Sequence, residues 1–407
     1  MATSTERTKV PPPAPAPEGG PPEDRGTRRL LFVLLGVLVL GAIALLVLLV
    51  WLLRPAATAE SGATAGGYPI QVVTTIYGYG DEPNELVRTP LGVTFDPDGN
   101  VWLSNTGQAR VEQYTSDGTY IRTVGADGPG KLYSPYGLAV DAERGRLYVA
   151  DYGAGAIQVF STEGGYVTHF PADDQDLEVF GPDGFAPFDV NVAGGRVVVA
   201  SHDGLYFFDE TGHVVGRWGY THKGANVRGV ELGMFNFPDA FDIDPQNGRF
   251  YIADSLNRRI VAIDRQGRWL WVSGRPDSKG KIRGFWQLPR GIAVGADGNI
   301  YVVDTFRYDD EGMGAGHIVV LSPDGELLSE FGRTGTEDGS FRFPEQLESG
   351  PDGLWALADR ENHRVVIFRL LTPYPGVDEL EQPRYEGMLE LPSDVWSTPA
   401  PSPAPAG

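Results

Sequence analysis

The chain of 407 residues contains no cysteine. Without cysteine there are no disulfide bonds, no thiol nucleophile, no lipid-modified cysteine and no cysteine-based zinc site. The stability of any folded domain must therefore come from its hydrophobic core and from its topology.

Basic residues are scarce, because 33 Lys and Arg stand against 54 Asp and Glu and give a net charge of −21. Proteins that bind nucleic acid need a basic stripe opposite the phosphates. The composition argues against a nucleic-acid partner, and we interpret the acidic charge as an aid to solubility.

Common catalytic motifs are also missing, since the sequence has no GxSxG, no HExxH and no glycine loop of the phosphate-binding type. The six histidines show no metal-type spacing such as HxxxH, which favours scattered surface positions. They are His169, His202, His213, His222, His317 and His363. Nothing in the sequence marks a nucleophile.

The sequence does contain a motif that is repeated six times. Each repeat has a proline, a short apolar strand, a Gly-rich turn and a second strand that often ends in Ala-Asp. The repeats are 45 to 55 residues apart, a period typical of propellers and solenoids. They begin at Pro90, Pro135, Pro187, Pro238, Pro289 and Pro344. Apolar residues alternate with a period of two, which predicts four short strands, a to d, in each repeat. We predict an all-β fold, a six-bladed β-propeller of four-stranded antiparallel blades, preceded by one transmembrane helix.

The sixth repeat lacks its last strand, because no further strand pattern follows Phe368. The missing strand has its counterpart at the other end, where residues 73–78 match residues 120–125. We expect residues 69–78 to complete the last blade, which closes the ring without a free edge. The predicted propeller covers residues 69–373 and is expected to be monomeric.

One long apolar run, residues 30–53, carries no charge and has enough residues to span a bilayer as a helix. Arg25, Arg28 and Arg29 precede this run, and after Arg54 the next basic residue is Arg88. The positive-inside rule then predicts a single-pass protein of the cell membrane with a cytoplasmic N-terminus and an extracytoplasmic propeller. A cleaved signal peptide is the alternative, which the length of the run disfavours.

The remaining segments have no packing pattern. Residues 1–29 are predicted to be a disordered Pro-rich cytoplasmic tail, and residues 54–68 a flexible linker. Residues 374–407 are predicted to be a disordered tail, first acidic and then rich in Pro and Ala.

The two faces of the predicted ring differ. Short Asp/Gly turns join a to b and c to d, whereas the b–c and d–a connections are long and unlike one another. The long segments are residues 171–186, 220–237, 275–288, 333–343 and a b–c loop at 306–316. Variable loops on a rigid scaffold usually carry binding. We therefore place function on this side, the variable face.

Two groups of residues are candidate sites. Four residues after three of the prolines stand Asn191, Asp242 and Glu348, whose oxygens would suit a hard cation such as calcium at the ring axis. A water-filled polar channel is the alternative. Two positions earlier, Asp189 and Gln346 replace the usual glycine.

The second candidate is a basic and aromatic segment that could bind a sugar, a peptide or an anion. Its predicted ligand-binding residues are Arg275, Lys279, Lys281, Arg283, Trp286 and Arg290. A solvated loop is the alternative for this segment, and the neighbouring Trp269 and Trp271 are expected to pack within a blade. The recurring Asp-x-x-Asn-x-Arg runs at 254–259 and 359–364 are expected to be structural turn staples.

Segments 135–160, 238–263 and 289–321 combine Pro-x-Gly or a close variant, Tyr-Val/Ile-Ala-Asp or a close variant, and apolar strands. This combination resembles the NHL repeat family. The resemblance implies a propeller, while members of the family serve as protein-binding modules, RNA readers, extracellular sensors and lyases.

We therefore expect a membrane-anchored extracytoplasmic propeller that binds a protein, a peptide or an envelope polymer without catalysis. The alternative is a metal-dependent lyase or hydrolase similar to the streptogramin or amidating lyases. In that case Asn191, Asp242 or Glu348 would hold an axial metal together with a histidine such as His202 or His317.

Overall fold

The computed structural model describes residues 70–222, 225–273, 275–276, 282–283, 286–309 and 312–371. The predicted membrane-spanning run, the linker that follows it and both terminal tails lie outside the described residues. Within the described part of the chain, no helix is both long and apolar enough to cross a membrane.

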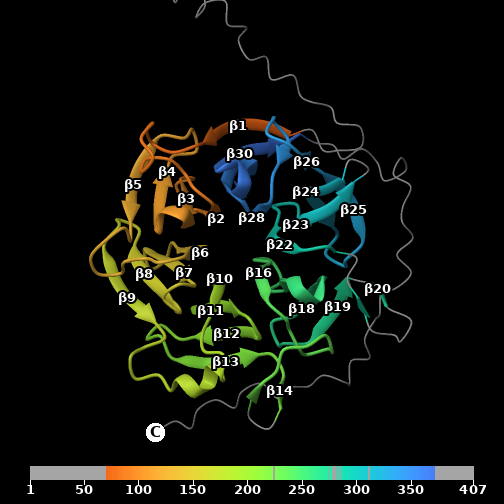
Figure 1. The fold of residues 1–407 in the computed structure, drawn as a ribbon. Helices are drawn as coiled ribbons and strands as arrows, with labels where there is room; N and C mark the ends of the chain where they lie inside the picture. Colours follow the sequence, from red (N-terminus) through yellow and green to blue (C-terminus); the bar gives the residue numbers. More distant parts are fainter. Residues whose placement is uncertain are drawn as a thin grey trace, which may run out of the picture. The chain divides into compact units, whose positions relative to one another are not determined.

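Six four-stranded antiparallel sheets surround a central axis and form a β-propeller (Figure 1). Blade one contains β2 (Pro90–Phe95), β3 (Val101–Asn105), β4 (Arg110–Tyr114) and β5 (Tyr120–Val124). Blade two contains β6 (Pro135–Asp141), β7 (Arg146–Asp151), β8 (Ala156–Ser161) and β9 (Tyr166–Phe170). Blade three contains β10 (Pro187–Ala193), β11 (Arg196–Ser201), β12 (Gly204–Phe208) and β13 (Val214–Trp218).

The other half of the ring repeats this order. Blade four contains β16 (Pro238–Ile243), β17 (Phe250–Asp254), β18 (Arg259–Ile263) and β19 (Trp269–Ser273). Blade five contains β22 (Pro289–Val294), β23 (Ile300–Asp309), β24 (Gly312–Leu321) and β25 (Leu327–Phe331). The predicted fold of six four-stranded antiparallel blades is confirmed.

Blade six is built from both ends of the propeller. It contains β28 (Pro344–Ser349), β29 (Leu354–Asp359), β30 (Arg364–Leu370) and β1 (Ile70–Ile76). β1 runs antiparallel to β30, with Ile70 opposite Leu370, Ile76 opposite Val365 and a shift of register after Val72. This is the pairing that the repeat predicts, and it closes the ring.

The six first strands, β2, β6, β10, β16, β22 and β28, lie next to one another around the axis. The neighbouring backbones come so close that a Cβ on Gly92 would lie 2.0 Å from the carbonyl oxygen of Tyr136. A Cβ on Gly137 would lie 2.1 Å from Asp189 Oδ1. Glycine two residues after the proline therefore lets the inner strands meet.

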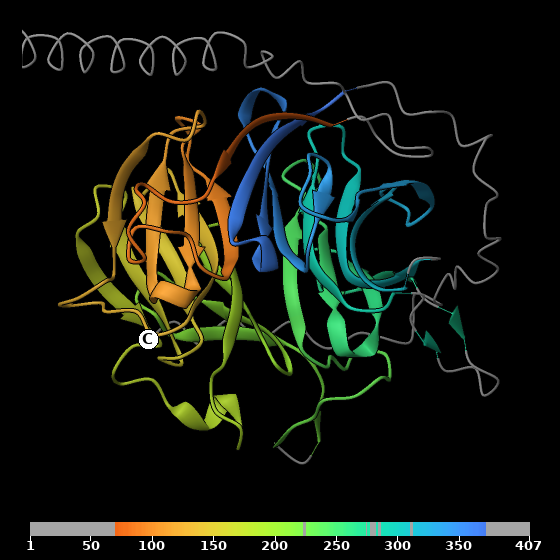
Figure 2. The ribbon, with the colours of Figure 1, turned by 45° about the horizontal axis from the view of Figure 1, so that its top comes forward.

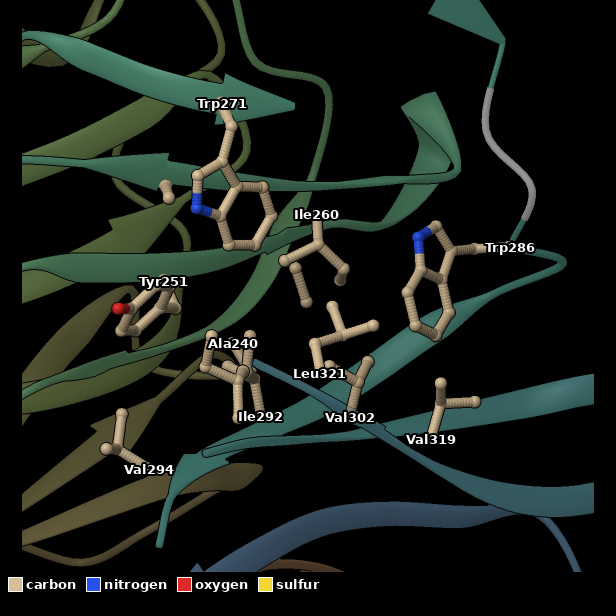
Figure 3. Close-up of a cluster of buried hydrophobic side chains, with 13 residues drawn as sticks. Ala240, Tyr251, Ile260, Trp271, Trp286, Ile292, Val294, Val302, Val319 and Leu321 are labelled. Atoms are coloured by element: carbon tan, nitrogen blue, oxygen red, sulfur yellow. The ribbon is translucent and has the colours of Figure 1, made fainter. Parts of the chain in front are cut away.

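The core is divided among the blade interfaces rather than gathered at one centre. Each of the six apolar clusters found in the described residues joins two adjacent blades. Figure 3 shows the cluster between blades four and five, where Trp271 and Trp286 approach Ile260 and Leu321. Burial of apolar surface thus holds each blade to its neighbours.

A buried aspartate at the end of the second strand fastens several blades. Asp254 Oδ1 accepts a hydrogen bond from Asn236 N at 2.8 Å, and Asp254 Oδ2 accepts from Asn257 Nδ2 at 2.8 Å and Arg259 Nε at 2.7 Å. Asp359 makes the same three bonds in blade six. The prediction that these runs are structural staples is confirmed.

The long connections carry short elements of their own. The small strands are β14 (Thr221–His222), β15 (Ala225–Asn226), β20 (Arg275–Pro276), β21 (Ile282–Arg283), β26 (Arg333–Thr334) and β27 (Ser340–Phe341). The 3₁₀ turns are η1 (Thr106–Gln108), η2 (Leu177–Phe180), η3 (Ser255–Asn257), η4 (Pro351–Gly353) and η5 (Arg360–Asn362). In Figure 2 the connections of residues 171–186 and 225–237, yellow-green and green, extend from one side of the ring.

The connection at 306–316 differs from the prediction. We expected a loop, but β23 and β24 continue into it as a hairpin, with Arg307 opposite Ala315 and Asp309 opposite Gly312. Strand pairing satisfies backbone groups that a loop would leave to water.

Candidate binding site at the ring axis

The residue that follows each of the six prolines lies at the axis, where the d–a connections enter the inner strands. Blades one to three supply apolar or aromatic side chains there, and blades four to six supply charged ones. The six are Leu91, Tyr136, Phe188, Asp239, Arg290 and Glu345. Together with Gly137, Asp189, Ala240 and Gln346 they line one pocket, which we call the axial pocket. It opens on the variable face.

The axial pocket is small. It has room of about 30 Å³ for the centres of water molecules, or about 320 Å³ of empty space when its open mouth is included. The pocket therefore suits one small group and not a whole drug-sized molecule.

Ion pairs form the charged wall. Arg290 lies with one terminal nitrogen 3.2 Å from Asp239 Oδ2 and with Nε 3.6 Å from Glu345 Oε2. Arg360, from η5, reaches Glu345 Oε1 at 2.6 Å. Burial raises the pKa of Asp239 to about 6, and the Arg290 charge opposes this rise.

Aromatic rings form the opposite wall. Tyr152 stacks on Phe188 with ring centroids 5.4 Å apart, and Tyr136 meets Phe188 edge-on at 6.0 Å. Phe237 contacts Phe188 from the next blade at 5.6 Å. Because Tyr152 is 44% exposed, this wall extends from the pocket to the surface.

A hydrogen bond across the axis makes the floor. Gln346 Nε2 of blade six donates to Asp189 Oδ1 of blade three at 3.0 Å, and Gln346 Oε1 accepts from Val93 N at 3.0 Å. Asp189 Oδ2 accepts from Phe241 N at 3.1 Å, and burial raises the pKa of Asp189 to about 7. We call the Gln346 and Asp189 pair the crossbar.

The predicted metal ligands lie in the next layer of the inner strands. Asn191 Nδ2 donates to Asp242 Oδ1 at 3.0 Å, and Asp242 Oδ2 accepts from Val294 N at 2.7 Å. Burial raises the pKa of Asp242 to about 6, and burial followed by the charges of Asp242 and Asp189 raises the pKa of Glu348 well above its usual value.

This polar layer has no metal geometry of the usual kind. Among the described residues, no three His, Asp or Glu side chains are placed to hold a metal ion. Asn191 also turns its amide nitrogen, not its oxygen, toward Asp242. Calcium binding by Asn191, Asp242 and Glu348 stays a prediction.

The structure does not bring the basic and aromatic segment together as one surface. Trp286 is 1% exposed in the core between blades four and five, and its Nε1 donates to Ser273 Oγ at 3.1 Å (Figure 3). Arg275 and Arg283 are opposite each other in the pair β20 and β21. The predicted ligand residues Lys279 and Lys281 lie outside the described residues. Of this set, Arg290 lines the axial pocket.

Two histidines near the variable face have structural partners. His202 Nδ1 is 3.0 Å from Ser201 Oγ, and its Nε2 is 3.7 Å from Asp183 Oδ2. Ser201 is fully buried and its Oγ accepts from Ala186 N, so this row of Ser, His and Asp has no accessible nucleophile. His363 Nδ1 accepts from Thr89 N at 3.1 Å.

Comparison with known proteins identifies part of the repeat. Residues 132–160 match the NHL repeat. This NHL repeat contains the first three strands of blade two and the approach to them.

Solved structures share the fold at low identity. A protein of unknown function from Bacteroides thetaiotaomicron is 14% identical, with a TM-score of 0.50 over 74% of this chain and 76% of that chain. A streptogramin B lyase is 17% identical, with a TM-score of 0.48 over 73% of this chain and 98% of the other. The WD40 propeller domain of Doa1 is 13% identical, with a TM-score of 0.45 over 74% and 96%. At 14% identity the likeness to the Bacteroides protein shows the fold alone.

Large exposed apolar side chains distinguish the two faces of the propeller. Eight of them lie on b–c or d–a connections, and we call these eight the apolar rim. The apolar rim consists of Tyr77, Tyr79, Tyr133, Tyr152, Leu177, Tyr220, Val230 and Leu256. The others lie on outer strands or at the end of β30, and within the described residues none lies on an a–b or c–d turn.

Of the six positions directly after the prolines, Arg290 alone was predicted from the sequence to bind a ligand. The signal was present, because that position changes from apolar in the first three repeats to charged in the last three. A position that varies within a strict repeat, at a place where strands converge, indicates a site.

Proposed function

We propose that this propeller is a binding module that docks a protein or a peptide on its variable face and has no catalytic activity of its own. The observation that carries the proposal is the apolar rim. Large exposed apolar surfaces mark interaction sites in soluble domains, and eight of the 14 large exposed apolar side chains of the described residues lie on connections of this face. Tyrosine is also among the residues that contribute most at protein interfaces.

The axial pocket supports a large partner over a small one. The pocket is small, with room of about 30 Å³ for the centres of water molecules, whereas the apolar rim lies on connections of several blades on the same face. A macromolecule that covers the rim and inserts one group into the pocket uses both features. An envelope polymer is the second kind of partner that this arrangement suits.

We also propose that the propeller is held at the outer side of a cell membrane. The support is the uncharged run of residues 30–53 and the arginines that precede it. In that position the variable face would meet other envelope proteins or polymers.

The proposal predicts that apolar rim substitutions abolish binding while equivalent outer-strand substitutions do not. Tyr133 and Leu256 are 63% and 52% exposed, so a Tyr133→Ser, Leu256→Ser chain should fold normally. The full chain in detergent is used to select peptides from a displayed library and is tested against isolated envelope polymers. We expect the double variant to bind the selected partner at least about tenfold more weakly, since hot-spot residues each contribute more than a factor of ten.

The matched control is Val167→Ser, Val215→Ser, which removes exposed apolar side chains from the outer strands β9 and β13. Its affinity should stay close to that of the wild type. Equal losses in both variants, or the absence of any selected partner, would refute the proposed binding face.

The lyase or hydrolase alternative depends on an axial metal. The observation in its favour is the raised pKa values of Asp242 and Glu348, because a bound cation would offset the cost of their buried charges. The alternative predicts stoichiometric calcium or zinc in the full chain purified without chelator. It also predicts a lower melting temperature in EDTA and loss of the metal in Glu348→Gln. A metal-free chain whose melting temperature ignores EDTA would remove this alternative.

A further inference from the structure

The axial pocket carries more negative than positive groups. Three carboxyl groups line it, those of Asp189, Asp239 and Glu345, against the single guanidinium of Arg290. Arg360 compensates Glu345 from outside the lining at 2.6 Å. Because the charges of Arg290 and Arg360 balance those of Asp239 and Glu345, the excess negative charge is that of Asp189. It is present above the pKa of Asp189, which burial raises to about 7, and it favours a cation.

The ion pairs in the charged wall leave hydrogen-bonding groups without partners. Arg290 Nε is buried and donates no hydrogen bond to any described residue, because Glu345 Oε2 is 3.6 Å away. Arg290 lies near both carboxylates, at 3.2 Å from Asp239 and 3.6 Å from Glu345, but donates a hydrogen bond to neither of them. A second donor entering the pocket finds free acceptor positions on both.

The apolar half of the pocket is suited to the same guest. Tyr136 and Phe188 place aromatic rings opposite the carboxylates, and Tyr152 extends this surface outward. A cation next to an aromatic ring is stabilised by the ring's quadrupole, and methylene groups pack on the same ring. The small volume of the pocket suits an ammonium with its last methylene group.

We propose that the axial pocket binds the ammonium group of a lysine side chain presented by the partner. The side chain enters from the variable face, its methylene groups lie along Tyr136 and Phe188, and its ammonium donates to Asp239 and Glu345. The identity of the partner rests on the proposed function, whereas the preference of the pocket for lysine does not.

The pH dependence of this binding follows from two lining carboxyl groups, Asp189, whose pKa burial raises to about 7, and Asp239. Burial raises the pKa of Asp239 to about 6, Glu345 and Asp254 raise it further, and Arg290 and a hydrogen bond from Ser255 lower it. Above this pH the carboxylate is ionised and attracts the ammonium, while lysine, with a pKa of about 10.4, stays charged throughout. Affinity should therefore rise between pH 5 and pH 8.

The experiment uses the full chain and short blocked peptides, measured by isothermal titration. The test peptide is acetyl-Gly-Gly-Lys-Gly-Gly-amide, and the comparison peptides carry Nε-acetyl-lysine or glutamate in its place. Blocking removes the terminal charges. We expect the acetylated and glutamate peptides to bind at least about tenfold more weakly than the lysine peptide. Acetylation removes the positive charge of the lysine, and glutamate replaces it with a negative one. Lysine binding should weaken by a similar factor from pH 8 to pH 5.

Two substitutions should act in opposite directions. Asp239→Asn removes a carboxylate and should weaken lysine binding about tenfold, whereas Arg290→Gln removes the competing guanidinium and should tighten it at pH 8. Asp264→Asn is the control, because its ion pair with Arg268 is on the c–d turn of blade four, away from the axial pocket. It should leave lysine binding unchanged.

The outcomes separate the two proposals. Two results with the wild-type chain would overturn the lysine pocket. The first is equal binding of the lysine and acetyl-lysine peptides, and the second is tighter binding of the glutamate peptide than of the lysine peptide. Tighter glutamate than lysine binding that Arg290→Gln abolishes would identify an anion pocket instead. A selected partner that depends on Tyr133 and Leu256 but contains no required lysine would keep the proposed function and refute the lysine pocket. Binding of the lysine peptide without any selected partner would keep the lysine pocket and refute the proposed function.

Discussion

Asp254→Ala should lower the free energy of unfolding by about 3–5 kcal/mol, the range found when one partner of a buried ion pair is removed. Arg259 is 1% exposed and lies 2.7 Å from Asp254, so the substitution leaves its charge buried without a carboxylate. Asn236 N loses its acceptor in the same step, and Asn257 Nδ2 keeps only the carbonyl oxygen of Gly229. Urea unfolding followed by tryptophan fluorescence measures the loss.

Asp264→Ala in the same blade is the matched control. Its partner Arg268 is 65% exposed and four residues away in the chain. Exposed pairs of this kind contribute about 0–1 kcal/mol, so little stability should be lost. Equal losses at Asp254 and Asp264 would show that the staple does not fasten the blade.

Deletion of residues 70–76 should open the ring and cost about 4–8 kcal/mol, which is comparable with the whole stability of many domains. β1 contributes Ile76 to the core between blades six and one, and Ile70 and Val72 pack against the core between blades five and six. Without β1 the strand β30 becomes a free edge, which invites pairing between molecules. Thermal unfolding and size-exclusion chromatography measure both effects.

A synthetic peptide of residues 69–78, added to the deleted chain, should restore the melting temperature and the monomeric state. A scrambled peptide of the same composition is the control. A deleted chain that remains monomeric with the wild-type melting temperature would contradict the importance of closure.

The repeat made the ring predictable because each blade uses the same local signals. Alternating apolar residues define the strands, Asp/Gly turns define their ends, and the missing strand after Phe368 has a visible counterpart at the start of the propeller. The staples at Asp254 and Asp359 were recognisable because the same residue types recur at the same spacing. Such features depend on sequence neighbours alone.

Features that depend on which way a connection folds were harder to predict. Trp286 was expected to bind a ligand, but its connection folds back so that the indole side chain lies in the core between blades four and five. Nothing in a run of Trp, Arg and Lys residues says which side chain turns inward. The pairing of Arg307 with Ala315 likewise needs both strands of a hairpin, which a single segment does not reveal.

The axial pocket shows the same limit in another form. Tyr136, Asp239 and Glu345 are far apart in the chain and meet because six strands converge. The neighbouring position at Asn191 and Asp242 was singled out from the same alignment of prolines. What the sequence does not reveal is that Arg290 enters between two carboxylates.

The crossbar has a consequence for transport. Blades three and six are half a turn apart in the ring, so the bond from Gln346 to Asp189 spans the central hole. A ring whose central hole is crossed by a hydrogen-bonded pair of side chains is not built as a channel for solutes. A ligand that enters from the variable face therefore stays on that side of the crossbar. Substitutions in the short turns of the opposite face should leave the axial pocket unchanged.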